Sequence, residues 1–212
     1  MHRFDPPRRA FAAALAALAG FVDALGFLLA GGYFVSFMSG NTTRLAVDIA
    51  TDPRSAVLPA GLIALFVAGV FTGGVAAFKA GTARKPAVLA LVTAMLVAAA
   101  VLHRAGLAGP AIAALVFAMG ALNNTFQRGG EVAIGLTYMT GALVKIGQGL
   151  AARMTGQGGS GWASYLGLWC GLASGALAGA LAWSRWEAGA LWLAAGWAAA
   201  MIIVALRLPA ER

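Results

Sequence analysis

Polar and charged side chains gather in one otherwise apolar stretch, residues 34–50, FVSFMSGNTTRLAVDIA. The groups in it that could bind a solute or an ion belong to Ser39, Gly40, Asn41, Thr42, Thr43, Arg44 and Asp48. Hydroxyl and amide groups donate and accept hydrogen bonds, and a guanidinium adds a permanent charge with fork-shaped donors. This set of side chains predicts a binding site or filter for a small solute that is anionic or strongly dipolar.

A plainer version of the same pattern recurs in the second half of the chain. A shift of 101 residues aligns Phe37 with Tyr138, Met38 with Met139, Ser39 with Thr140, Gly40 with Gly141 and Arg44 with Lys145. The second copy contributes Thr140, Gly141, Lys145 and Gln148 to the predicted site. Internal self-similarity of this kind is typical of duplicated folds, so we expect one repeat over 10–104 and a second over 109–207.

Backbone geometry gives the polar stretch a second possible role. We expect Ser39-Gly40-Asn41 to break a helix, with Asn41 as the N-cap of a helix over 42–50. A helix that begins inside the membrane directs free N–H groups and a partial positive charge at the midplane. The alternative is that Arg44 and Lys145 only extend to lipid headgroups, or that Asp48 neutralises Arg44 within its own helix.

Asp23 lies well inside the first apolar segment, and the repeat aligns it with Asn124. A carboxylate within a membrane span is costly and indicates function by default. It could carry a coupling proton or sodium ion, or it could pair with Arg44. Asn124 keeps the polarity without the charge, and the alternative for it is a hydrogen bond between helices.

Composition identifies the environment of these groups. The chain has 212 residues, of which 61% are hydrophobic and 10% are charged, against about 25% charged in soluble domains. Apolar runs of about 20 residues can span a bilayer, so we expect an all-α integral membrane protein formed by a single membrane domain, 1–212. The expected spans are 10–31, 56–78, 86–102, 109–127, 162–183 and 188–206. The first resembles a signal peptide, but its apolar run continues past the possible cleavage site, so we expect it to remain.

Basic residues predict how these spans are oriented. If 34–50 and 132–152 enter the membrane as re-entrant helices without crossing, six spans remain and both termini share one side. That side then has ten cations, namely Arg3, Arg8, Arg9, Lys79, Arg84, Lys85, Arg128, Arg153, Arg207 and Arg212, while the other has three, namely Arg54, Arg104 and Arg185. Eight full crossings would give a weaker bias. The positive-inside rule favours six spans with cytoplasmic termini, and three spans per repeat make the repeats inverted.

Other classes of function have little support in the sequence. No motif for catalysis or nucleotide binding occurs, and no Cys/His cluster has the spacing of metal ligands, so we expect no enzyme, metal or cofactor. The net charge of +8 arises from residues at span ends, so nucleic acid is not an expected partner. Gly69-x-x-x-Gly73 and Gly171-x-x-x-Gly175-x-x-x-Gly179 allow helices to approach closely, either within one chain or in a homodimer.

The stretch GFVDALGFLLAGGYFVSFMSGNTTRLAVDIA, residues 20–50, resembles the YoaK family of bacterial membrane proteins, a domain of unknown function. TYMTGALVKIGQGL, at 137–150, resembles the second signature of that family. The resemblance covers nearly the whole chain and implies a six-span protein of the bacterial inner membrane. It implies no particular activity. The residues themselves favour a transporter or facilitator of a small solute, with an uncoupled channel or a non-transporting scaffold subunit as alternatives.

Overall fold

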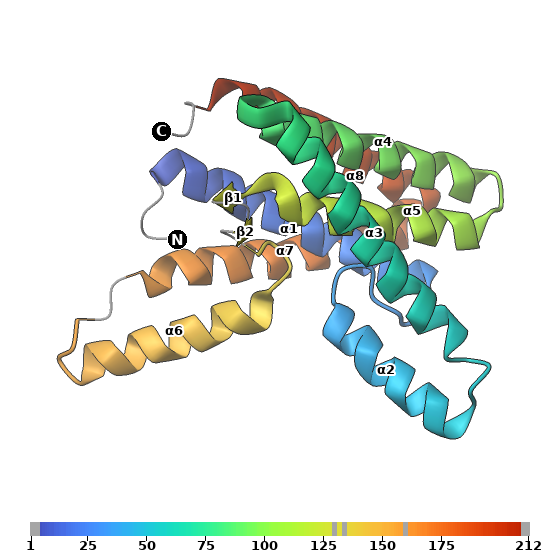
Figure 1. Cartoon of the computed structure of the whole chain (residues 1–212), viewed down its shortest axis with the longest axis horizontal. Helices are drawn as coiled ribbons and strands as arrows, with labels where there is room; N and C mark the ends of the chain where they lie inside the picture. The colour runs from blue at the N-terminus through green and yellow to red at the C-terminus, as the bar shows by residue number, and fades with distance from the viewer. Residues whose placement is uncertain (1–4, 129–130, 133–134, 159–160, 209–212) are drawn as a thin grey trace.

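A computed structural model of the chain describes residues 5–128, 131–132, 135–158 and 161–208. The longer helices pack into one bundle, which α3 crosses obliquely (Figure 1). They are α1 (Pro6–Leu29), α3 (Val57–Ala80), α4 (Arg84–Arg104), α5 (Ala108–Leu122), α7 (Trp162–Trp186) and α8 (Ala188–Arg207). By itself α5 has 15 residues, and the 3-10 turn that follows it extends the helical stretch to Thr125, 18 residues in all. Each of these helices matches one of the expected spans, because long uninterrupted Ala/Leu/Gly/Val runs leave the helix as the structure that pairs every backbone group internally.

The remaining elements are short. Two half-length helices are α2 (Met38–Thr51) and α6 (Met139–Met154). Two 3-10 turns, η1 (Gly81–Ala83) and η2 (Asn123–Thr125), follow α3 and α5. The strands β1 (Gln127–Arg128) and β2 (Glu131–Val132) pair antiparallel. By length and composition, five continuous helical stretches in the described residues could cross a membrane, and one of these, Val57–Arg104, holds both α3 and α4.

Elements of the two halves are interleaved in the packing of the bundle. The most extensive pairing joins α1 to α7, and the next pairings join α3 to α5, α4 to α5 and α4 to α8. The first helix of each half therefore packs against the third helix of the other half. Neither expected repeat has its own separate core, although the boundary between 104 and 109 does fall in the turn between α4 and α5. The duplication itself stays a prediction.

Glycines allow these crossings to be close. A Cβ added at Gly171, Gly175 or Gly179 of α7 would meet the backbone carbonyl of Ala13, Ala17 or Phe21 on α1. Likewise, a Cβ added at Gly69 or Gly73 of α3 would meet the backbone of Phe117 or Ala121 on α5. The Gly-rich faces are therefore covered by helices of the same chain, as the alternative of packing within one chain predicted, and these contacts give no support to a homodimer through the same faces.

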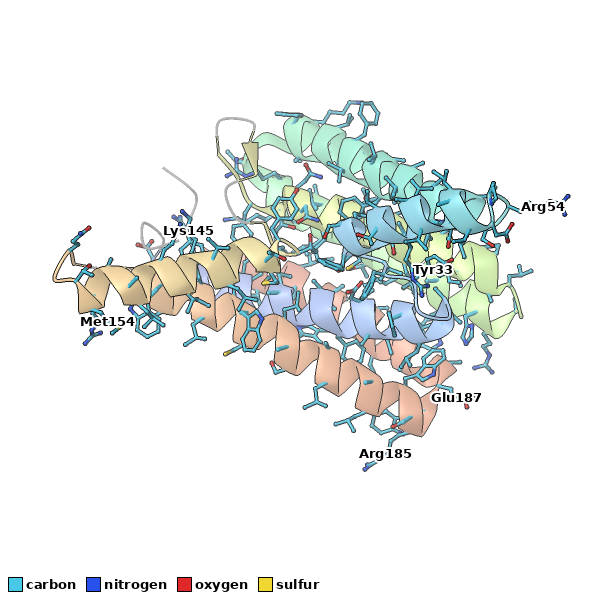
Figure 2. The ribbon with its side chains drawn as sticks, turned by 90° about the horizontal axis from the view of Figure 1, so that it is seen from below. Tyr33, Arg54, Lys145, Met154, Arg185 and Glu187 are labelled. Atoms are coloured by element: carbon cyan, nitrogen blue, oxygen red, sulfur yellow. The ribbon has the colours of Figure 1, made fainter. Side chains whose placement is uncertain are left out.

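The two half-length helices begin near the middle of the bundle and run toward opposite ends (Figure 1). The start of α1 and the end of α8 lie at the same end as the last turn of α6. Met154 lies at that end, and Arg54, Arg185 and Glu187 lie at the opposite one (Figure 2). Of the cations used to predict orientation, Arg3 and Arg212 fall outside the described residues.

Candidate functional site

The chain reaches the middle of the bundle by doubling back after α1. Gly31 and Gly32 have φ of 63° and 95°, a left-handed conformation that glycine adopts at little cost. The Gly32 N–H donates to the Phe27 carbonyl at 2.9 Å, which closes the end of the helix. The returning segment then lies along α1, where Gly26 leaves the space that the fully buried Val35 side chain fills.

Asp23 fixes how far the chain returns. Its Oδ1 accepts hydrogen bonds from the backbone N–H groups of Val35, at 3.0 Å, and Ser36, at 2.7 Å. Asp23 lies six residues before the end of α1, which is about 9 Å along the helix axis at ~1.5 Å per residue. The start of α2 is thereby held inside the bundle, about a quarter of the way along the 24 residues of α1 from its end. Within the described ranges no ion pair joins Asp23 to Arg44.

Asn41 closes the same loop from the other side. It is fully buried, its Oδ1 accepts from the Phe34 N–H at 3.0 Å, and its Nδ2 donates to the Phe34 carbonyl at 2.7 Å. The helix starts at Met38, three residues before Asn41, so the prediction of Asn41 as N-cap after a break at 39–41 is wrong. The helical conformation is instead interrupted at 30–37. The side chain of Asn41 hydrogen-bonds to the backbone of Phe34 in this loop and does not cap α2.

In the second half of the chain, other contacts place the start of α6 inside the bundle. There α5 ends at Leu122 and tightens into η2, so the long helix itself stops at the level of Asn124. Asn124 donates through Nδ2 to the Val70 carbonyl of α3, at 2.9 Å. Thr137 donates to Oδ1 of the buried Asn123 at 3.2 Å, which secures the chain just before α6. The position matched to Asp23 thus joins two helices, as the structural alternative for Asn124 predicted.

A cavity of about 250 Å³ lies where the two half-length helices begin. Its walls come from matched positions of the repeat, with Ser36, Phe37, Met38 and Ser39 on one side and Thr137, Tyr138, Met139, Thr140 and Gly141 on the other. Phe66 of α3 completes the lining. This volume lies just below the ~300–1,000 Å³ of pockets for drug-sized ligands, so it suits a small solute.

Hydroxyl groups and helix N-termini give the cavity its chemical character. In the part of the chain that the structure describes, the backbone N–H groups of Met139, Thr140 and Gly141 have no acceptor, as is usual in a first turn. The partial positive charges of two helix N-termini add at this point. The cavity therefore favours a negative or strongly dipolar solute without supplying a full positive charge of its own.

Some of the predicted site residues line this cavity and others do not. Ser39, Thr140 and Gly141 line it. Gly40 lies in the first turn of α2 and leaves room for the ring of Phe37. Thr42 and Thr43 are exposed, and their hydroxyls donate to the carbonyls of Met38 and Ser39 in their own helix, at 2.8 and 3.2 Å.

The predicted charged residues lie outside the cavity lining. The Arg44 guanidinium lies 4.5 Å from the centroid of the Tyr33 ring, and Tyr33 donates to Oδ2 of Asp48 at 3.3 Å. Arg44 and Asp48 thus share Tyr33 as a partner, and in the described residues they form no ion pair with each other. Lys145 and Gln148 are exposed on α6 and are absent from the cavity lining. Arg44 and Lys145 therefore lie outside the lining of this cavity, and a role for them in binding a solute stays a prediction.

Several residues that line the cavity were not among the predicted site residues: Ser36, Phe37, Met38, Phe66, Thr137, Tyr138 and Met139. The repeat itself could have identified most of them, because Phe37 aligns with Tyr138 and Met38 with Met139. Phe66 has no such signal, since it lies on another helix. No group of three or more His, Cys, Asp or Glu side chains that could hold a metal ion occurs in the described residues.

Comparison with known proteins covers almost the entire chain. A family model described as "Protein of unknown function (DUF1275)" matches residues 11–204. The UPF0700 transmembrane protein RA0705 of Rhizobium meliloti (strain 1021) is 36% identical over 202 residues, which are 94% of this chain and 87% of that protein. No solved structure matches. These matches confirm a helical transmembrane protein of a family of unknown function, and neither description uses the name YoaK.

Proposed function

We propose that this chain, which belongs to the DUF1275 family of transmembrane proteins of unknown function, carries a small anionic or dipolar solute across the membrane. One observation supports this most strongly. Two half-length helices start at one cavity, with hydroxyl groups of Ser39, Thr137 and Thr140 and the free N–H groups of α6 beside it. Interrupted helices with their N-termini at the midplane are a recurring feature of solute transporters.

The proposed orientation follows from the charges at the two ends. Six long helices cross the membrane, and α2 and α6 are re-entrant helices that enter it from opposite sides. The end that holds the start of α1 and the last turn of α6 faces the cytoplasm, because the basic residues are concentrated there. The two halves are then inverted repeats, and the membrane is the bacterial inner membrane.

The role of Asp23 bears on whether transport is coupled to an ion or is uncoupled. The Oδ1 atom of Asp23 is already engaged by two backbone N–H groups, so we assign Asp23 the task of holding the loop before α2 in place. A facilitator that needs no coupling ion agrees best with that role. An uncoupled channel is the nearest alternative, and its flux would stay proportional to solute concentration where a facilitator saturates.

Gly141 provides a specific test of the cavity. Gly141 lines the cavity, and an added Cβ there would meet nothing within 4 Å. We therefore expect Gly141→Leu to narrow the cavity without disturbing the backbone. Gly147→Leu, on the same helix and equally open but away from the cavity, is the matched control. The measurement is the solute-dependent swelling of proteoliposomes, with formate, nitrate, acetate, glycine and urea as probes.

We expect at least one of the anions or glycine to enter faster than into empty liposomes. Gly141→Leu should abolish this entry, and Gly147→Leu should keep it. Entry that Gly141→Leu leaves intact would place the pathway elsewhere. Absence of entry for every probe with wild-type protein would favour the scaffold alternative.

A further inference from the structure

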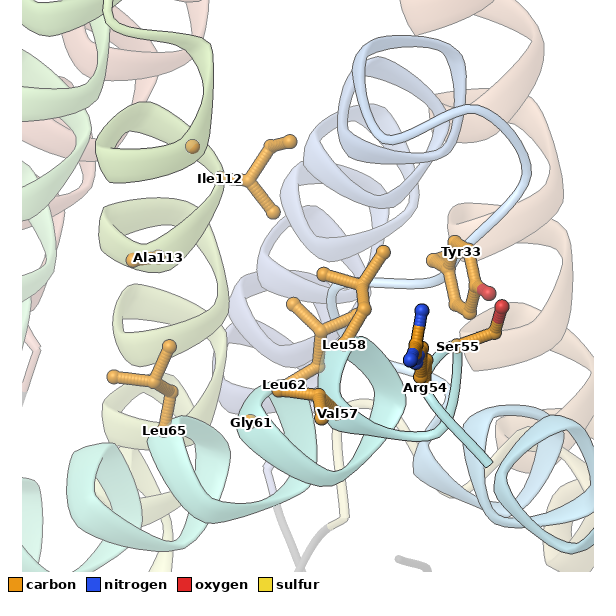
Figure 3. Close-up of a pocket in the computed structure, with 11 residues that line it drawn as sticks. Tyr33, Arg54, Ser55, Val57, Leu58, Gly61, Leu62, Leu65, Ile112 and Ala113 are labelled. Atoms are coloured by element: carbon orange, nitrogen blue, oxygen red, sulfur yellow. The ribbon is translucent and has the colours of Figure 1, made fainter. Parts of the chain in front are cut away.

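A second hollow, of about 500 Å³, lies between the start of α3 and the start of α5 (Figure 3). Its walls are apolar along most of their length, formed by Leu58, Leu62, Leu65, Ile112 and Ala113. Tyr33, Arg54 and Ser55 form its mouth, at the end of the bundle where Arg54 appears in Figure 2. This groove is separate from the cavity between α2 and α6, and the two share no lining residue.

Small residues keep the groove open. Gly61 of α3 and Gly109 of α5 both line it, and an added Cβ at either would meet nothing within 4 Å. Leu62 forms a buried floor, whereas Leu58 is 45% exposed at the rim. The groove therefore opens sideways from the bundle, where its surroundings in a membrane are lipid.

The dimensions of the groove match one leaflet of a bilayer. From Val57 to Leu65, α3 rises about 12 Å at ~1.5 Å per residue. One leaflet contributes about 15 Å of hydrocarbon to a core ~30 Å thick. An acyl chain whose headgroup is at the level of Arg54 can thus follow the groove toward the midplane.

Charge at the mouth favours a phosphate group. Arg54 is exposed, and its side chain extends beside Tyr33 at the mouth of the groove (Figure 3). The neighbouring Asp52 does not form an ion pair with it among the described residues, because the Asp52 carboxylate accepts from Ser55 Oγ at 2.6 Å and from the Arg54 backbone N–H at 3.3 Å. A guanidinium in this position can donate two parallel hydrogen bonds to a phosphate.

We propose that the groove between α3 and α5 binds one glycerophospholipid, with its phosphate at Arg54 and an acyl chain along Leu58, Leu62 and Leu65. The inference is independent of the proposed transport function, because it concerns a different cavity and a different ligand. A water-soluble solute would gain little there, since among the described residues the polar side chains of the lining, Tyr33, Arg54 and Ser55, are all at one end.

Groove-filling variants test this proposal. Purified protein is depleted of lipid in detergent, and phosphatidylglycerol or diacylglycerol with the same acyl chains is added back. Retained lipid is counted by native mass spectrometry, and the midpoint of thermal unfolding is measured alongside. Gly61→Leu blocks the groove, and Gly196→Leu, at an equally open position on α8, is the control.

We expect wild-type protein and Gly196→Leu to retain one phosphatidylglycerol more than Gly61→Leu, and to gain thermal stability from it by mass action. Arg54→Gln should bind the phospholipid no better than diacylglycerol. If Gly61→Leu retains as much phospholipid as wild type, the site is not this groove. If wild type binds both lipids equally, or retains only detergent, the role of Arg54 toward phosphate is overturned.

Discussion

The Oδ1 atom of Asp23, six residues before the end of α1, lies 2.7 Å from the backbone nitrogen of Ser36, thirteen residues later in the chain. This hydrogen bond determines where α2 begins, because Ser36 is two residues before its first turn. The sequence predicted a functional role for the Asp23 carboxylate. In the structure this carboxylate holds the loop before α2, and with it the start of α2 beside the cavity. The predictions below start from this relationship.

Asp23→Leu should destabilise the fold far more than Asp23→Asn. Leucine leaves the Val35 and Ser36 N–H groups without their acceptor, and an unsatisfied buried donor costs about 1–3 kcal/mol. Asparagine keeps a carbonyl oxygen in place of Oδ1. For a chain of this length, 1 kcal/mol corresponds to about 2–4 °C in the midpoint of thermal unfolding, which is the measurement. Equal midpoints for the leucine variant and wild type would contradict the role assigned to Asp23.

Asp23→Asn also tests whether Asp23 only holds the loop before α2 or also carries a coupling ion. Asp23→Asn cannot release or bind a proton at neutral pH, yet it can still hold the loop. We expect solute entry into proteoliposomes to persist in Asp23→Asn. Loss of entry in a variant as stable as wild type would instead assign Asp23 to coupling.

Alanine should have opposite effects at two glycines of α7. At Gly175 an added Cβ would meet the Ala17 carbonyl of α1, and overpacking costs about 1–3 kcal/mol. At Gly167 it would meet nothing within 4 Å, and alanine is favoured over glycine in a helix by about 0.5–1 kcal/mol. Gly175→Ala should therefore lower the thermal midpoint, and Gly167→Ala should leave or raise it. A midpoint for Gly175→Ala as high as that of Gly167→Ala would mean that α1 and α7 are not packed this closely.

Arg44→Gln and Lys145→Gln should both leave solute entry unchanged. Arg44 is stacked on Tyr33 and Lys145 is exposed on α6, so neither lines the cavity. Exposed substitutions of this kind change stability by about 0.5 kcal/mol or less. The assay is the swelling of proteoliposomes with the solute that Gly141→Leu excludes. If either variant stops entry at normal protein stability, the solute is contacting the charge, and the sequence-based assignment is restored.

Labelling with a membrane-impermeant thiol reagent should separate six crossings from eight. The exposed Cys170 is first changed to serine. In that background, Met154→Cys marks the end that we propose to be cytoplasmic, and Glu187→Cys marks the opposite end. Pro53→Cys, in the turn after α2, should react from the same side as Glu187→Cys, because a re-entrant α2 returns to the side it came from. Reaction from the side of Met154→Cys would show that α2 crosses fully.

The sequence by itself determined the six long helices and the position of the two polar motifs. Apolar run length is a local property, and it predicts a spanning helix wherever about 20 residues lack charges. The shift of 101 residues also aligned the residues that line the cavity, since Phe37 and Tyr138, Met38 and Met139, and Ser39 and Thr140 all lie there. These features needed no knowledge of how the helices pack.

Tertiary structure decided where the helix breaks and which side chains line the cavity. The sequence predicted the break at Ser39-Gly40-Asn41, and the structure has it at 30–37. Gly31 and Gly32 end α1 there, and the side chains of Asp23 and Asn41 bind the backbone of the loop that follows. Arg44 does not line the cavity, and its guanidinium packs on the ring of Tyr33, in the loop before α2. Phe66, from α3, lines the cavity although its position along the chain did not indicate this. The face that a short helix turns toward a cavity depends on the contacts of its neighbours, and spacing along the sequence does not contain those contacts.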